Sequence, residues 1–173
     1  MLNNAITLEG QLETVQQAKE FLLGLTVENY QAVIKPHFAS SAGTHMRHIL
    51  DHYLALQDGL SQGLVNYNKR NRYSDIESCP ETALLQWQKV EHWLQEVSQL
   101  NTDMPLLVLC ETSVNETQNT QTKSTLAREL VFVSSHAIHH FSLLAVINSL
   151  LGNKDEENFG IAPSTATYIR QQA

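Results

Sequence analysis

The sequence predicts a single all-α domain, residues 1–173, built as a four-helix bundle with one long crossover. Four long segments have apolar residues at intervals of three or four, which is the period of an amphipathic helix. Polar or turn-forming residues separate these segments, and one connection is long enough to be a crossover. A chain of 173 residues can bury one substantial core but is short for two domains.

The first two helices are expected over residues 7–30 and from residue 44 to about residue 64. In the first, apolar side chains recur every three or four residues. Pro36 and the small residues 40–43 then interrupt the pattern and offer an N-cap for the second helix. The next connection, residues 66–78, is polar and must run over the surface or cover a site.

The third helix is expected to begin with Ser78 as its N-cap, Pro80 in its first turn and Glu81 at the capping-box position. Residues 105–110 are apolar and β-prone, and residues 117–123 are polar and rich in threonine. A small β-hairpin is therefore expected between the third and fourth helices.

The fourth helix is expected to begin after Ser124 or Thr125, either of which can cap it. It should end near Leu151, because Gly152 supplies a C-terminal stop. The apolar residues within the tail, residues 155–173, predict that it packs back on the bundle.

Composition and charge exclude several classes of partner. A net charge of -7 argues against binding to nucleic-acid phosphates. Cys79 and Cys110 form neither a disulfide framework nor a Cys-x-x-Cys motif, so reduced thiols in a cytoplasmic protein are expected. Residues 1–5 lack the basic start of a secretory signal, and the run at 143–147 is far shorter than the roughly 20 residues of a membrane span. No nucleic acid and no membrane is expected as a partner.

Histidines mark the candidate site. His136, His139 and His140 lie within the longest apolar helical stretch. Residues four apart lie on one helix face, about 6 Å apart along the axis, so His136 and His140 can hold one ion. An unpaired imidazole on an apolar face costs a few kcal/mol, and a pair at this spacing favours a metal site. His139 points nearer the boundary and is expected to be a supporting hydrogen-bond donor or a surface residue.

A third ligand is expected from the second helix, which carries His45, His48 and His52 at helical spacing. Apolar periodicity favours His45 or His52, whereas His48 lies on a stripe of small residues where another helix could approach closely. The helical-wheel positions leave the choice among the three open. Asp51 and Glu129 lie one or two turns from histidines, and each is either a support that orients an imidazole or a solvated charge.

The polar connection contains a second group. Arg70 and Arg72 carry planar guanidinium groups that can hold a carboxylate through two hydrogen bonds. That carboxylate is either part of a substrate or the side chain of Glu77, which would make the group an internal ion pair. In an enzyme, His52 or His139 would move a proton or fix the tautomer of a ligand.

These motifs together resemble the DinB/YfiT-like superfamily over nearly the whole chain. The resemblance is carried by the histidine-rich segment 41–52 with its small-residue start, the arginine-rich connection and the His136-x-x-x-His140 pair. Members of that superfamily are four-helix bundles with a three-histidine metal site, one ligand from the second helix and two from the fourth.

Carried over to this chain, the resemblance implies His48 as the ligand from the second helix, because His48 lies seven positions after Ser41 in the small-residue start. His136 and His140 are then the other two ligands. The additional histidines at 45 and 52 depart from the family pattern and leave ligation by either of them open.

The resemblance implies a metal-dependent enzyme of thiol chemistry, similar to transferases that use a low-molecular-weight thiol. The divalent ion would be zinc, nickel or iron, since all three suit imidazole ligands. Its partners would be a small-molecule substrate, such as a thiol, and a second copy in a homodimer. The alternative is a non-catalytic metal-stabilised bundle that acts as a stress-response or interaction module.

Overall fold

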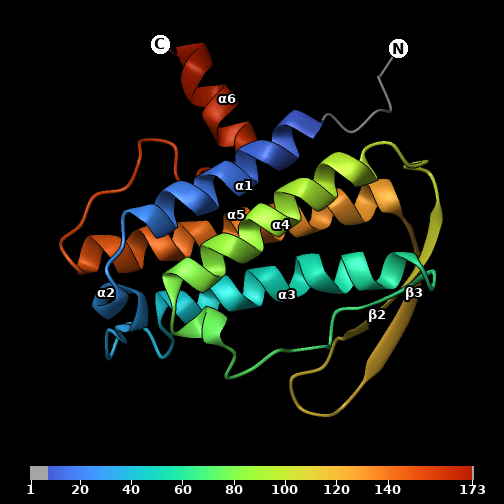
Figure 1. The fold of residues 1–173 in the computed structure, drawn as a ribbon, viewed down its shortest axis with the longest axis horizontal. Helices are drawn as coiled ribbons and strands as arrows, with labels where there is room; N and C mark the ends of the chain where they lie inside the picture. The colour runs from blue at the N-terminus through green and yellow to red at the C-terminus, as the bar shows by residue number, and fades with distance from the viewer. Residues whose placement is uncertain (1–7, 173) are drawn as a thin grey trace.

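The computed structural model describes residues 8–172, which form six α-helices, a three-stranded sheet and a short 3₁₀ helix, Asp75–Glu77 (Figure 1). The helices are α1 (Leu8–Leu23), α2 (Val27–Gln31), α3 (Ala42–Leu60), α4 (Pro80–Val97), α5 (Leu126–Leu150) and α6 (Pro163–Gln172), and the strands are β1 (Leu64–Asn66), β2 (Pro105–Glu111) and β3 (Asn119–Thr125). The expectations for residues 1–5 and for a helix start at residue 7 lie outside the described residues. The fold is mostly helical, as predicted.

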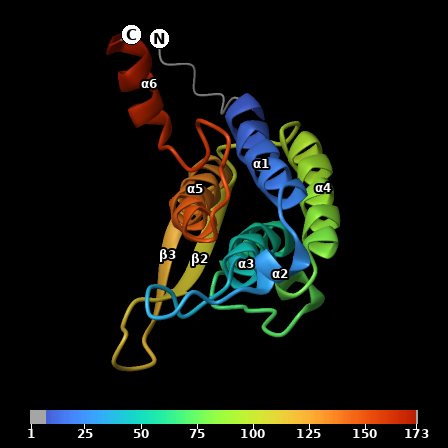
Figure 2. The same cartoon turned by 90° about the vertical axis from the view of Figure 1, so that its left-hand side faces the viewer.

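Four long helices form the body of the molecule. α1 packs against α4 and α5, and α3 packs against the same two helices. The end view in Figure 2 shows these four helices around a common centre. Large apolar side chains from three of them, including Met46, Trp87 and Phe141, are wholly buried there. Their burial is the main favourable term in folding, and it holds α3 and α5 side by side.

The first predicted helix is divided in two. α1 ends just before Gly24, and α2 begins after Thr26, whose hydroxyl oxygen accepts a hydrogen bond from the α2 backbone at 3.2 Å. Glycine disfavours a helix interior and threonine favours a new start. Tyr30 on α2 then donates to the backbone carbonyl of Ile76 at 2.6 Å. The prediction of one helix over residues 7–30 was wrong because a local break and a distant contact favour two.

The longer helices begin as their cap residues predict, with one correction. Ser41 caps α3 and Thr125 caps α5, each by accepting a hydrogen bond from the backbone of the first turn. The residue that caps α4 is Cys79, whereas Ser78 was predicted. Ser78 instead closes the preceding 3₁₀ helix, because its backbone N–H donates to the carbonyl of Asp75.

Residues 155–173 were predicted to pack back on the body, and only the first part of this tail does so. The ring of Phe159 stacks on Phe21 and Phe141, with centroids 4.8 Å and 5.2 Å away. Gly152 and Gly160 allow this return because each has a positive φ, which glycine adopts without strain. α6 then leaves the body and buries none of its residues (Figure 1).

The predicted β-hairpin is present between α4 and α5. β2 and β3 are antiparallel, with Glu111 opposite Asn119, and β1 extends the sheet by pairing parallel with β2. β1 was not predicted, because a strand of three residues shows no periodic pattern. A Cβ added at Gly59 would lie 2.7 Å from the carbonyl oxygen of Leu64, so the small-residue stripe of α3 accommodates this strand.

α5 is long and apolar enough to cross a membrane by length and composition alone. No membrane span was predicted, because the prediction considered only the apolar run at 143–147, which is one part of this longer helix. The finding is weak evidence for a membrane, since the core helix of a soluble protein passes the same test. In this fold α5 packs against α1 and α3.

Candidate metal centre

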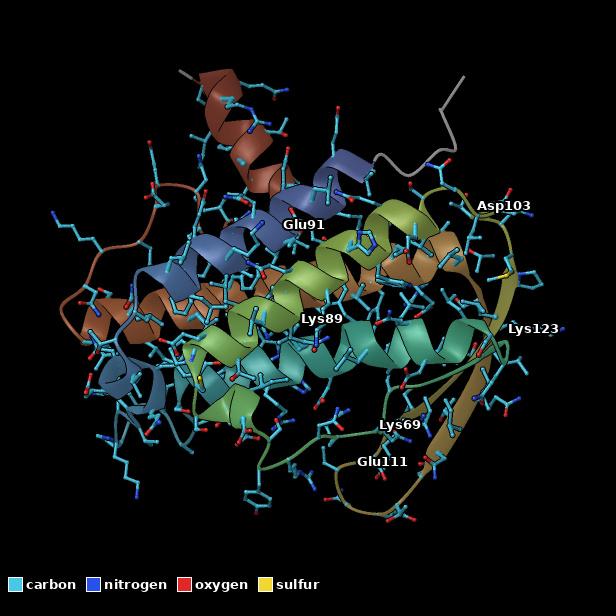
Figure 3. The ribbon with its side chains drawn as sticks, in the orientation of Figure 1. Lys69, Lys89, Glu91, Asp103, Glu111 and Lys123 are labelled. Atoms are coloured by element: carbon cyan, nitrogen blue, oxygen red, sulfur yellow. The ribbon has the colours of Figure 1, made fainter. Side chains whose placement is uncertain are left out.

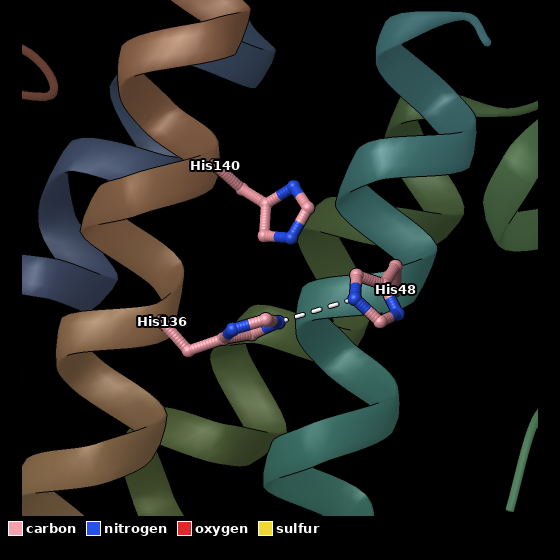
Figure 4. A group of neighbouring side chains, drawn as sticks. All are labelled: His48, His136 and His140. Atoms are coloured by element: carbon pink, nitrogen blue, oxygen red, sulfur yellow. Dashed lines mark hydrogen bonds between the residues drawn. The ribbon is translucent and has the colours of Figure 1, made fainter. Parts of the chain in front are cut away.

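Three imidazoles converge between α3 and α5. His48 comes from α3, and His136 and His140 come from α5 (Figure 4). One ring nitrogen of each lies within 4.8 Å of the other two, and all three side chains are half-buried. The Nε2 atoms of His48 and His136 are 3.1 Å apart. These residues, called the three-histidine group below, can hold a metal ion.

The packing of α5 explains how two of these side chains reach the same place. Ala137 and Phe141 are wholly buried in the core, and each follows one of the histidines directly. His136 and His140 therefore lie at the edge of the buried face, one above the other. Ser135 and other polar residues on the opposite side are exposed, as the sequence predicted.

The spacing of the group suits a tetrahedral ion. Two nitrogen atoms bound to one zinc at 2.0–2.1 Å in tetrahedral geometry are about 3.3 Å apart. The Nε2 atoms of His48 and His136 already lie 3.1 Å apart. A ring nitrogen of His140 lies within 4.8 Å of both.

The surroundings keep these imidazoles neutral. Burial lowers the pKa of His48 to about 2, that of His136 to about 3 and that of His140 to about 4, and the neighbouring imidazoles add to the effect. A neutral imidazole has the lone pair that a metal ion requires. At neutral pH the group can therefore accept an ion without first losing protons.

Metal-free protein is expected to lose stability as the pH falls from about 6.5 toward 4. In the unfolded chain a histidine has a pKa near 6.5 and takes up a proton in this range. In the folded chain the pKa values of about 2, 3 and 4 keep these side chains neutral. Unfolding therefore takes up protons, and the free energy of unfolding decreases with falling pH. Urea titrations at pH 7 and pH 5, with chelator present, measure the difference.

Two variants make that measurement specific. Replacing all three members of the group with glutamine should reduce the dependence of stability on pH. His92→Gln, a substitution at an exposed histidine outside the group, gives the comparison. The expectation fails if the triple variant keeps the full pH dependence of the natural sequence.

His45 contacts the group without being one of its three members. Its Nδ1 lies 2.9 Å from Nδ1 of His140, and its Nε2 lies 2.9 Å from the hydroxyl of Ser40. A hydrogen bond at Nδ1 orients the ring of His140 and leaves its Nε2 free for a ligand bond. His45 is therefore placed to orient a member of the group.

The two histidines predicted to support catalysis lie in different surroundings. His52 is buried, and its Nδ1 donates to the backbone carbonyl of His48 at 2.9 Å, so its Nε2 carries the lone pair. The ring centroids of His52 and His136 are 4.1 Å apart. His139 is exposed, with its ring centroid 5.4 Å from that of His140. His52 thus adjoins the group, whereas His139 lies at its solvent edge.

The predicted arginine pair is separated. Arg70 is half-buried and donates to two backbone carbonyls of its own connection, whereas Arg72 is exposed. Glu77 pairs with neither, and its Oε1 accepts from Nε of Arg47 at 2.8 Å. This pairing follows from close packing, since a Cβ added at Gly43 would lie 2.0 Å from the carbonyl oxygen of Glu77. The expected internal pairing of Glu77 with Arg70 or Arg72 was wrong.

Asp51 and Glu129, the two acidic residues near the histidines, form their hydrogen bonds with residues other than the histidines. Asp51 accepts hydrogen bonds from Arg47 at 2.8 Å and from the side chain of Asn71 at 2.9 Å. Glu129 is wholly buried and accepts from the hydroxyl of Tyr67 at 2.7 Å. Both carboxylates therefore hold the connection after β1 in place. Sequence reasoning did not assign a role to Arg47 or Asn71, because their partner contacts depend on the folded arrangement.

A cavity of about 580 Å³ opens beside the three-histidine group. His52, Tyr67, Arg70 and Phe132 are among the residues that line it. The ring centroid of Phe132 lies 5.9 Å from that of His136, so the group stands directly behind this wall. The volume suits a small molecule. The sequence analysis missed Phe132, although its position one helix turn before His136 is a signal that could have found it.

The fold and the site together define a helix-rich protein with a three-histidine group that can hold a metal ion. No family model matches the chain, and no solved structure matches it. One curated protein, FK506-binding protein 5 of Rhizopus delemar, is 32% identical over 109 residues, which are 63% of this chain and 28% of that protein. The chain thus spans little more than a quarter of the relative that it matches.

Proposed function

We propose that this chain is a metal-dependent enzyme of thiol chemistry, similar to the thiol transferases of the DinB/YfiT-like superfamily. In this proposal α1, α3, α4 and α5 form a four-helix bundle, which is supported by the packing of α1 and α3 against both α4 and α5. His48, His136 and His140 hold the ion, for which zinc, nickel and iron all match the donors. The sequence motifs described above support the family assignment.

The observation that carries the proposal is the convergence of three neutral imidazole nitrogens within 4.8 Å of one another. Three imidazoles leave one position of a tetrahedral ion open, where a bound thiolate or water has a lowered pKa. The adjoining cavity of about 580 Å³ offers room for a substrate beside that position.

The surrounding side chains have separate tasks in this proposal. His45 orients His140 through the contact between their Nδ1 atoms. His52 carries a lone pair on Nε2, because its Nδ1 proton is held by a backbone carbonyl, and its ring lies beside that of His136. Burial lowers the pKa of His52, so it stays neutral and can accept a proton from an incoming thiol. His139 is a surface neighbour of His140.

Cobalt(II) in the site is expected to develop a sulfur-to-metal charge-transfer absorption when a small thiol, such as 2-mercaptoethanol, is added. The band requires an open coordination position, which three protein ligands leave. His140→Ala should give no such band, whereas His139→Ala should give the full band. A cobalt spectrum that thiols leave unchanged would contradict the enzyme and favour the alternative, a non-catalytic metal-stabilised module for stress response or protein interaction.

The proposal extends to the setting in which the enzyme works. We propose a cytoplasmic location, because Cys79 and Cys110 are both free thiols in the structure. We also propose a homodimer, formed through helix flanks that expose apolar side chains such as Val131 and Val146 on α5. Size-exclusion chromatography with light scattering measures the molar mass, and a monomer would contradict the dimer without affecting the metal site.

A further inference from the structure

The cavity beside the three-histidine group has walls from four parts of the chain. α3 contributes His52, and the connection after β1 contributes Tyr67 and Arg70. The hairpin contributes residues of both strands, including Val108 and Thr122, and the first turns of α5 contribute Arg128 and Phe132. Aromatic walls with a few polar groups are typical of a site for a small organic molecule.

Arg70 leaves several hydrogen-bond donors of its guanidinium group without a partner among the described residues. Its guanidinium donates through Nη1 alone, to backbone carbonyls of Tyr67 and Lys69. Among residues 8–172, the arginines with a carboxylate within 4.0 Å are Arg47 and Arg128. Burial lowers the pKa of Arg70, and the charges of Asp51 and Glu111, neither of which forms an ion pair with it, act in the opposite direction. A guanidinium in this state binds a carboxylate more strongly than any neutral acceptor.

The buried carboxylate on the cavity wall cannot serve Arg70. Glu129 already accepts hydrogen bonds from Tyr67, Ser124 and Arg128. Burial and this hydrogen bond raise the pKa of Tyr67, so its hydroxyl remains a donor. The acceptor oxygens of Glu129 are thus occupied from within.

Two charged residues of the hairpin, Glu111 and Lys123, also line the cavity. Lys123 is opposite Leu107, which is exposed, and the two share one face of the hairpin. Figure 3 shows the labelled Lys123 side chain pointing outward from β3. Glu111 shares that face, because it lies four residues after Leu107 in the same strand. The cavity is thus lined by three cationic side chains, Arg70, Arg128 and Lys123, and by two carboxylates, Glu111 and Glu129, which leaves the positive charge in excess.

We infer that this cavity binds a small organic acid, whose carboxylate is held by the guanidinium group of Arg70, with Arg128 adding positive charge. The role of this acid as the substrate or thiol co-substrate rests on the proposed function. Its binding to the cavity does not depend on that function. The sequence had paired Arg70 with Arg72 for this task. The structure instead assigns Arg128 as the second guanidinium, because Arg72 does not line the cavity.

The position of Arg70 also orients the ligand. Arg70 and His52 both line the cavity. The ring of His52, between the cavity and the group, is 4.1 Å from the ring of His136 between centroids. An acid bound to Arg70 therefore extends its other end toward the three-histidine group.

Isothermal titration calorimetry with glutarate tests the inference, using the neutral diamide of glutarate and inorganic phosphate as comparison probes. Glutarate should bind, and Arg70→Gln should weaken it at least about tenfold, as expected for the loss of a charge-assisted pair. Arg70→Lys should have an intermediate effect, because it keeps the charge and loses the planar donors. Arg72→Gln is the matched control and should bind glutarate like the natural sequence.

Several outcomes of these titrations would overturn the inference. Equal binding of glutarate by Arg70→Gln and Arg72→Gln, or no binding at millimolar concentrations, would overturn the inference. Binding of the diamide as tightly as glutarate would also overturn it, as would binding of phosphate alone. Circular dichroism confirms that each variant is folded. Because the titrations are made on metal-free and zinc-loaded protein, a failed metal site and a failed acid site are distinguished.

Discussion

His48→Ala and His140→Ala are each expected to lower metal affinity by more than about 100-fold, so that the purified variants lose their stoichiometric metal. Loss of a group that only supports a ligand costs 10- to 100-fold, and loss of a ligand costs more. The two residues lie on different helices and meet only at the three-histidine group. Metal analysis by mass spectrometry after gel filtration measures the content directly and identifies the ion.

The control for this experiment is His139→Ala. His139 is exposed and directly precedes His140, so the substitution tests for general damage to α5. It should retain the full metal content. His45→Ala should weaken binding by about 10- to 100-fold, since it removes only the partner of His140. If His48→Ala and His140→Ala both keep full metal, the proposed site is wrong.

Arg47→Met is expected to destabilise the fold by about 3–5 kcal/mol, because it leaves a buried carboxylate without its partner. Nη1 of Arg47 lies 2.8 Å from Asp51, and its Nε lies 2.8 Å from Glu77. The side chains of Arg47 and Asp51 are 8% and 2% exposed, so water cannot replace the lost partner. Urea titration followed by circular dichroism gives the free energy of unfolding.

Lys19→Met provides the matched comparison. Lys19 also makes a 2.9 Å ion pair, with Glu91, but the two side chains are 20% and 32% exposed. Ion pairs with water access contribute about 0–1 kcal/mol, so this variant should be nearly as stable as the natural sequence. Equal losses of stability in Arg47→Met and Lys19→Met would show that burial of the Arg47 network is not what stabilises the connection after β1.

The pairing of His136 with His140 could be predicted from the sequence, because their separation is one turn of a helix that the apolar pattern also predicts. The member from α3 could not be chosen in the same way. His45, His48 and His52 all lie within two turns, and each touches His140, His136 or both. The choice depends on how α3 is rotated and shifted against α5, which is a property of packing.

The partners of the arginines could be predicted from the sequence even less well than the α3 member of the three-histidine group. Arg70 and Arg72 lie two residues apart and carry the same group, yet one lines the cavity and the other is exposed. Glu77 was expected to pair with one of them and instead pairs with Arg47, 30 residues away. Nothing in the local sequence distinguishes these partners, because the backbone of the connection brings them together.

By itself, the sequence determined the long helices, most of their caps, the hairpin and the imidazole pair of α5. Each of these depends on residues within a few positions of one another, where helix period, strand propensity and cap chemistry act. Helix period left the imidazole of α3 open, and the tertiary structure brings His48, which the family resemblance implied, to this pair. Only the tertiary structure decided where β1 pairs and which guanidinium lines the cavity. Those outcomes depend on the relative placement of segments tens of residues apart, and the burial of the common core sets that placement.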